Sequence, residues 1–62
     1  MELSEAKEGL RVKYIPRHAE GDPNHRDCEV GFITSKNDTF VFVRYGTNYS
    51  SEATDPSDLI KW

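Results

Sequence analysis

The sequence predicts an all-β fold, a small barrel of five short strands formed as one domain by residues 9–62. Apolar side chains alternate with polar ones in short runs, which is typical of strands with one buried face. Turn-forming residues, above all Gly, Pro, Asn and Asp, separate these runs. We expect residues 1–8 to be a flexible or short helical lead-in, with Ser4 as its cap and Gly9 as its stop.

The first predicted strand covers residues 10–15, where apolar residues alternate with basic ones, and Pro16 ends it. A long polar loop, residues 17–28, follows this strand. Within the loop, residues 22–25 have the sequence Asp-Pro-Asn-His, which is typical of a type I turn. The loop therefore contains at least one defined turn.

The clearest hairpin pairs residues 29–34 with residues 40–45, and residues 35–39 connect them. A connection of three residues places Ile33 on one face with Val41 and Val43. A connection of two or four residues instead places Phe32 with those valines and Ile33 with Phe42. We favour the first arrangement.

The rest of the chain is predicted to form two more strands. Residues 46–48 are a turn, residues 49–54 a short strand, residues 55–58 a 3₁₀ turn, and residues 59–62 the closing strand. In the closing strand, Leu59, Ile60 and Trp62 are expected to pack against Leu10 and Val12.

Composition narrows the class of protein. The chain has 62 residues, of which 35% are hydrophobic, and a domain of this size buries only about 60% of its unfolded surface. Cys28 is the single cysteine, so no disulfide within the chain stabilises the fold, which fits a reducing compartment. The sequence has neither a membrane-spanning apolar run nor the pattern of a signal peptide, and we expect a cytoplasmic protein with no membrane partner.

The net charge of −3 disfavours non-specific nucleic-acid binding, which depends on many basic contacts with phosphates. The charge is unevenly spread, however. Residues 11–45 carry six Lys and Arg against five acidic residues, whereas both ends of the chain are acidic. Nucleic acid therefore stays open as a partner.

Several short patterns resemble SH3-like barrels of the Tudor and KOW families over residues 9–62. The residues that carry the resemblance are Gly9, Val12 and Tyr14, then Glu29-x-Gly31-x-Ile33, Val41-x-Val43-x-Tyr45 and Pro56-x-Asp58-Leu59. The resemblance implies an SH3-like barrel. Tudor domains read methylated lysine or arginine with an aromatic cage. The aromatic residues available for one are Tyr14, Phe42, Tyr45, Tyr49 and Trp62, and their pattern assigns no cage.

A second resemblance concerns the first strand and the loop. The string from Tyr14 to Ala19, together with Gly21-Asp22, His25, Asp27-Cys28-Glu29 and Asn37-Asp38, is similar to small phage or prophage-encoded proteins of uncharacterised function. It implies an origin and no mechanism.

Residues 18–28 bring together both histidines, the cysteine and three carboxylates. Imidazole and thiolate are zinc ligands, so His18, His25 and Cys28 are candidate metal ligands, with Asp22 or Asp27 needed as a fourth. The alternative is that the two aspartates accept hydrogen bonds within the loop while Cys28 is buried as a small apolar residue. We favour this alternative, and predict neither a metal nor another cofactor.

A nucleophilic cysteine with a nearby histidine also needs oxyanion donors and a closed pocket, for which a chain of this size has little volume. We therefore predict no enzymatic activity. Residues 40–43 are apolar on both faces of their strand, so part of this aromatic surface is left outside the barrel.

We predict a non-catalytic interaction module that binds a protein partner. The predicted partner-binding residues are Phe40, Phe42, Arg44, Tyr45 and Tyr49, with Arg11 as a further flanking residue. The alternative is a KOW-like barrel that binds nucleic acid by stacking bases on aromatics interleaved with basic residues.

Overall fold

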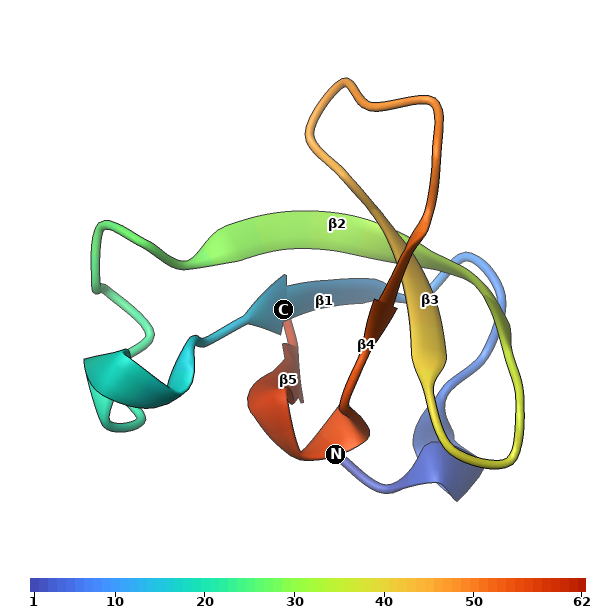
Figure 1. Ribbon diagram of the computed structural model, residues 1–62, viewed down its shortest axis with the longest axis horizontal. Coiled ribbons are helices and arrows are strands. Elements are labelled where there is room, and N and C mark those ends of the chain that lie inside the picture. The colour runs from blue at the N-terminus through green and yellow to red at the C-terminus, as the bar shows by residue number, and fades with distance from the viewer.

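A curled antiparallel sheet of five strands forms the protein, in the order β4-β3-β2-β1-β5 (Figure 1). The computed structural model describes all residues, 1–62. The strands are β1 (Arg11–Tyr14), β2 (Glu29–Lys36), β3 (Val41–Tyr45), β4 (Glu52–Thr54) and β5 (Leu59–Lys61). The other elements are three 3₁₀ turns, η1 (Leu3–Glu5), η2 (Arg17–Ala19) and η3 (Pro56–Asp58). The predicted all-β fold class is confirmed, with the sheet curled into a half-barrel.

The β2–β3 hairpin contains a β-bulge that the sequence did not predict. Ile33 pairs with Val43, but Ser35 pairs with Phe42, so the register shifts by one residue at Thr34. The connection between paired Lys36 and Val41 is four residues long, not the three that we favoured. The bulge compensates for this difference, because its extra residue returns Ile33 to the inner face. Ile33, Val41 and Val43 are all buried, as predicted.

A short row of aliphatic side chains fills the inside of the curl. The largest fully buried residues are Val12, Ile33, Val41, Val43 and Leu59. They come from four of the strands, and Ala6 and Tyr45 complete the buried cluster. The core therefore depends on the pairing of strands that are distant in the chain.

The first eight residues, expected to be a flexible or short helical lead-in, cover one end of this core. Ala6 is buried, while Met1 and Leu3 pack against the cluster from partly exposed positions. Glu2 rather than Ser4 precedes the turn, and its main-chain N–H donates to the Glu5 carboxylate at 2.8 Å. The segment is tied to the sheet by Lys61, whose ammonium lies 3.2 Å from the Glu5 carboxylate.

The largest difference between a predicted and an observed strand boundary is at the start of the fourth strand. We expected residues 49–54 to be extended, but β4 covers only Glu52–Thr54. The residues before it belong to a loop that projects from the sheet (Figure 1). The predicted turns at residues 46–48 and 55–58 are present, and Asp55 holds the second by accepting hydrogen bonds from the Ser57 N–H and hydroxyl. No helical segment of the structure has the length or apolar character to cross a membrane.

Gly31 lies where the backbones of β2 and β3 approach closely. A Cβ at this position would meet the Arg44 carbonyl oxygen at 2.6 Å and a Val43 methyl at 2.7 Å. We therefore expect Gly31→Ala to lower the free energy of unfolding by about 2 kcal/mol, since overpacking forces the strands apart. Urea denaturation followed by circular dichroism measures the change. Ser35→Ala, at an exposed position of the same strand, is the matched control and should unfold like the wild type.

Candidate binding surface

The outer face of the sheet carries a row of basic and aromatic side chains. Phe32 on β2 pairs directly with Arg11 on β1 and with Arg44 on β3, which places these three side chains side by side on one face. The Phe32 side chain is well exposed, with 53% of the residue's surface accessible. Neither arginine forms an ion pair. The row is therefore free to contact a partner.

Trp62 extends this row beyond β1. Its main-chain N–H donates to the Arg11 carbonyl oxygen at 3.1 Å, and the Lys13 ammonium lies 3.8 Å from the centre of its ring. We expected Trp62 and Ile60 to close the barrel, but Trp62 is 49% exposed and Ile60 is also exposed. Alternation places Leu59 and Lys61 on the inner side and Ile60 on the outer one, and of these only Leu59 is buried.

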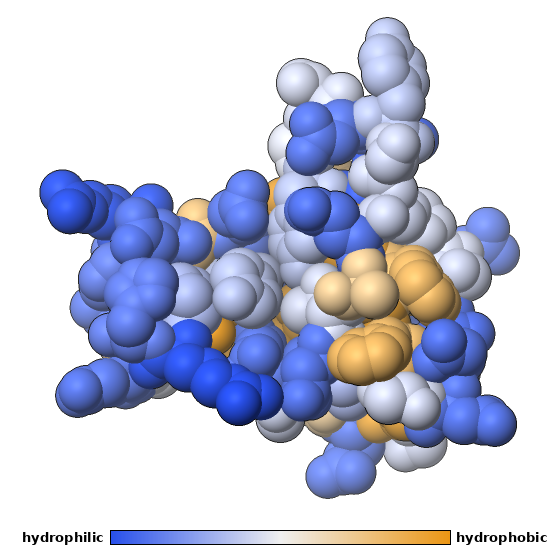
Figure 2. Space-filling model, in the orientation of Figure 1, coloured by the Kyte–Doolittle hydropathy of each residue, from blue (hydrophilic) through white to orange (hydrophobic).

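A second aromatic group lies over β3 and β4. Phe42 pairs with Ala53 across these strands, and Phe40 at the start of β3 is 40% exposed. Figure 2 shows an apolar patch over this part of the sheet, surrounded by hydrophilic residues. Because isolated exposed aromatics are common but contiguous patches mark contact surfaces, this patch indicates a contact surface beside the row.

The outer positions of the sheet carry positive charge only. By register they hold Arg11, Lys13, Val30, Phe32, Ser35, Phe42, Arg44, Ala53 and Ile60, and none is acidic. The net negative charge of the protein therefore resides elsewhere. We refer to this set, together with Phe40 and Trp62, as the outer face.

The predicted partner-binding residues are divided by the structure. Phe40, Phe42 and Arg44 belong to the outer face, whereas Tyr45 points inward and is buried. Tyr49 lies in the projecting loop and is 98% exposed. Sequence reasoning did not assign Phe32 or Lys13 to the surface. Both could have been assigned to the outer face from the alternation of side chains between the two faces of each strand, combined with the pairing of β1 with β2.

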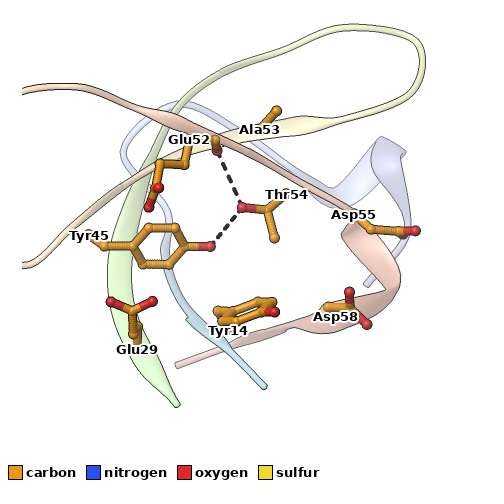
Figure 3. Close-up of a pocket in the computed structure, with 8 residues that line it drawn as sticks. All are labelled: Tyr14, Glu29, Tyr45, Glu52, Ala53, Thr54, Asp55 and Asp58. Carbon is orange, nitrogen blue, oxygen red and sulfur yellow. Dashed lines mark hydrogen bonds between the residues drawn. The ribbon is translucent and has the colours of Figure 1, made fainter. Parts of the chain in front are cut away.

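A hollow of about 310 Å³ lies on the inner side of the sheet, next to Tyr45. Figure 3 shows its lining residues, which are Tyr14, Glu29, Tyr45, Glu52, Ala53, Thr54, Asp55 and Asp58. Four of these are carboxylates. Arg17 lies 3.3 Å from Asp55 and 3.4 Å from Asp58, so two of the four are paired with a cation. The hollow is therefore electronegative, in contrast to the outer face.

Tyr45 connects this hollow with the core. Its hydroxyl lies 2.8 Å from the Thr54 hydroxyl, and Thr54 in turn donates to the Glu52 carbonyl oxygen at 3.3 Å (Figure 3). Burial raises the pKa of Tyr45 to about 12, and the nearby Glu29 and Glu52 carboxylates add to the rise. The pKa of Asp55 is lowered, chiefly by the hydrogen bond from the Ser57 N–H.

The five aromatic residues considered for a cage do not gather around one site. Tyr14 and Tyr45 are in edge-to-face contact, with ring centres 6.2 Å apart. Phe42 lies on the outer face, Tyr49 in the projecting loop and Trp62 beside Lys13. These side chains therefore form one aromatic pair and no cage.

The long loop brings together three of the candidate metal-ligand residues and leaves out Cys28. Donor atoms of His18, His25 and Asp27 all lie within 4.8 Å of one another. Cys28 is outside this group, half-buried, and its thiol donates to the Asp22 carbonyl oxygen at 3.3 Å. The hydrogen bonds expected of the aspartates are present, since Asp22 accepts from the Asn24 N–H and Asp27 contacts His18.

Comparisons with protein-family models, curated proteins and solved structures found no match. The resemblance to Tudor and KOW barrels, and to phage-encoded proteins, stays a prediction. The fold and the outer face define the chain only as a small all-β domain with a basic, aromatic sheet surface.

The raised pKa of Tyr45 makes stability depend on alkaline pH. Unfolded tyrosine ionises near pH 10, whereas folded Tyr45 keeps its proton to about pH 12. Between these values the unfolded chain binds fewer protons, so the free energy of unfolding should fall as pH rises, by on the order of 2 kcal/mol. Tyr45→Phe should flatten this dependence, while Tyr49→Phe should not. Urea denaturation at several pH values measures it, and equal slopes in wild type and Tyr45→Phe would contradict the assignment.

Proposed function

We propose that this protein is a non-catalytic interaction module that binds a protein partner through the outer face. The observation that carries the proposal is the row Arg44–Phe32–Arg11, continued by Trp62, in which basic groups alternate with exposed rings. Aromatic and arginine side chains contribute most of the energy at protein interfaces, because they combine large contact area with directed hydrogen bonds.

The charge of the outer face selects the kind of protein segment. Arg11, Lys13 and Arg44 favour carboxylates, and the rings between them favour apolar side chains. The row runs in one direction across β3, β2 and β1 to Trp62, and an extended segment can follow such a narrow stripe along its length. We therefore propose an acidic, extended segment with interspersed apolar residues as the partner.

Reversing the charge of the row should remove binding. On an array of acidic peptides with interspersed apolar residues, we expect Arg44→Glu and Phe32→Ala to weaken the binding of selected peptides by about tenfold or more. Arg26→Glu is the matched control, because Arg26 is an exposed arginine in the long loop and not on the outer face. Fluorescence anisotropy measures the affinities. Equal affinity for all three variants would refute the proposed surface.

A second candidate function is binding of single-stranded nucleic acid. The observation that favours it is the alternation of cations with exposed rings on an open sheet, since bases stack on aromatics while Lys and Arg contact the phosphates. The acidic hollow lies on the opposite side of the sheet and does not interrupt this face. In this reading Phe32, Phe42 and Trp62 are the stacking platforms.

Salt dependence separates the two functions. If single-stranded DNA or RNA is the ligand, three phosphate contacts predict that log K falls with log salt concentration at a slope of about −2. Anisotropy titrations of short oligothymidylate and oligouridylate at several salt concentrations measure this slope. Absence of binding at low salt excludes the nucleic-acid function and leaves the protein-binding one untouched.

Cys28 has no catalytic role in the proposed function. Its thiol has a carbonyl oxygen as its hydrogen-bond partner rather than a histidine, and so lacks the base that a nucleophile requires. A free thiol on a half-buried residue is best preserved under reducing conditions, and we propose the cytoplasm as the site of action.

A further inference from the structure

The long loop between β1 and β2 holds its side chains in place by a succession of tight turns. The main-chain N–H groups of Glu20, Asp22, His25 and Cys28 donate to the carbonyl oxygens of Arg17, Ala19, Asp22 and His25. Each of these bonds closes a turn, so the two ends of the loop approach each other. His18 comes from η2, and His25 and Asp27 from the returning half.

The three side chains meet at distances close to those of a metal site. Nε2 of His18 lies 2.7 Å from Oδ2 of Asp27, and Nδ1 of His25 lies 4.0 Å from the same oxygen. In a tetrahedral site with bonds of 2.0–2.2 Å, two donor atoms are about 3.3–3.6 Å apart. One observed distance is slightly shorter and the other slightly longer. All three donors lie within 4.8 Å of one another, so side-chain rotation has to bring them to a common distance from one ion.

The surroundings of the cluster also orient its members. The imidazole rings of His18 and His25 are edge-to-face, with centres 5.3 Å apart. The Asp27 main-chain N–H donates to Nδ1 of His25 at 3.0 Å, so Nδ1 is the unprotonated ring nitrogen, and an ion bound there takes the place of this hydrogen bond. All three side chains are partly accessible, which leaves a path for an ion and room for a water molecule.

We propose that His18, His25 and Asp27 bind one divalent zinc ion, with water as the fourth ligand. Two imidazoles and a carboxylate are a donor set that zinc accepts, and a site with three protein ligands keeps one open position. Zinc has no geometric preference from its d electrons, which suits donors fixed by a loop. Zinc at Nε2 of His18 requires the neutral tautomer with its proton on Nδ1, so the metal replaces the contact between Nε2 and Asp27 while the ring keeps one proton.

Zinc would stabilise the part of the fold that the core does not reach. Pro16 and Ala19 are the only buried residues between β1 and β2, and no strand forms within this loop. A metal ion that joins residues 18, 25 and 27 closes the loop on itself. In a small domain such a link supplements a small core.

Isothermal titration of the tag-free, full-length chain with zinc chloride tests the proposal. We expect one ion per chain, and an affinity lowered by more than about tenfold in each of His18→Gln, His25→Gln and Asp27→Asn. Cys28→Ser and Asp22→Asn are matched controls from the same loop, and both should bind like the wild type. Cobalt(II) in place of zinc should give visible bands without the near-ultraviolet thiolate band.

A ¹H–¹⁵N correlation spectrum of the wild-type protein, recorded during zinc addition, makes the test independent of whether the variants fold. The largest shifts should fall on residues 17–28. Absence of saturable binding up to about 1 mM zinc would overturn the proposal. So would loss of binding in Cys28→Ser, because the thiol would then be a ligand.

Discussion

The packing of Val12, Ile33, Val41, Val43 and Leu59 against one another is the interaction on which the whole structure depends. These side chains come from β1, β2, β3 and β5, so their packing holds the sheet curled. The space inside the curl admits little more, and the close approach of β2 to β3 at Gly31 shows how tightly it is filled. With no disulfide to help, every strand must place one face on this row.

This constraint also explains the distribution of charge. Because successive residues of a strand point to opposite faces, the inner position of each strand determines what its neighbours expose. On β1, placing Val12 inside turns Arg11 and Lys13 outward. At the sheet margins the inner side opens to solvent, and there Glu29 and Glu52 line the hollow with Tyr45 between them (Figure 3). The same alternation thus yields a basic outer face and an acidic hollow.

The sequence was sufficient for the fold class, the inner residues of the hairpin and the turns, because all of these follow from local periodicity and turn chemistry. It was not sufficient for the bulge at Thr34, which depends on how two strands fit each other. The prediction that Trp62 packs against the core was wrong. It was based on the size of the side chain, whereas the ring lies beside Lys13 on the outer face. In the loop, spacing suggested Cys28 as a ligand, but the direction of a side chain in a turn brings Asp27 to the histidines instead.

The exposed aromatics are not explained by folding. Phe32 and Phe40 leave much of their surface in water, and removing either would take little from a core made of aliphatic side chains. Exposed aromatic rings on an open sheet with unpaired edge strands favour aggregation. The neighbouring Arg11 and Arg44 oppose it, because their positive charges repel a second copy of the protein. A face that is costly in solution and unnecessary for the core is consistent with the proposed role in partner binding. The cations that keep copies apart are the same groups that would attract an acidic partner.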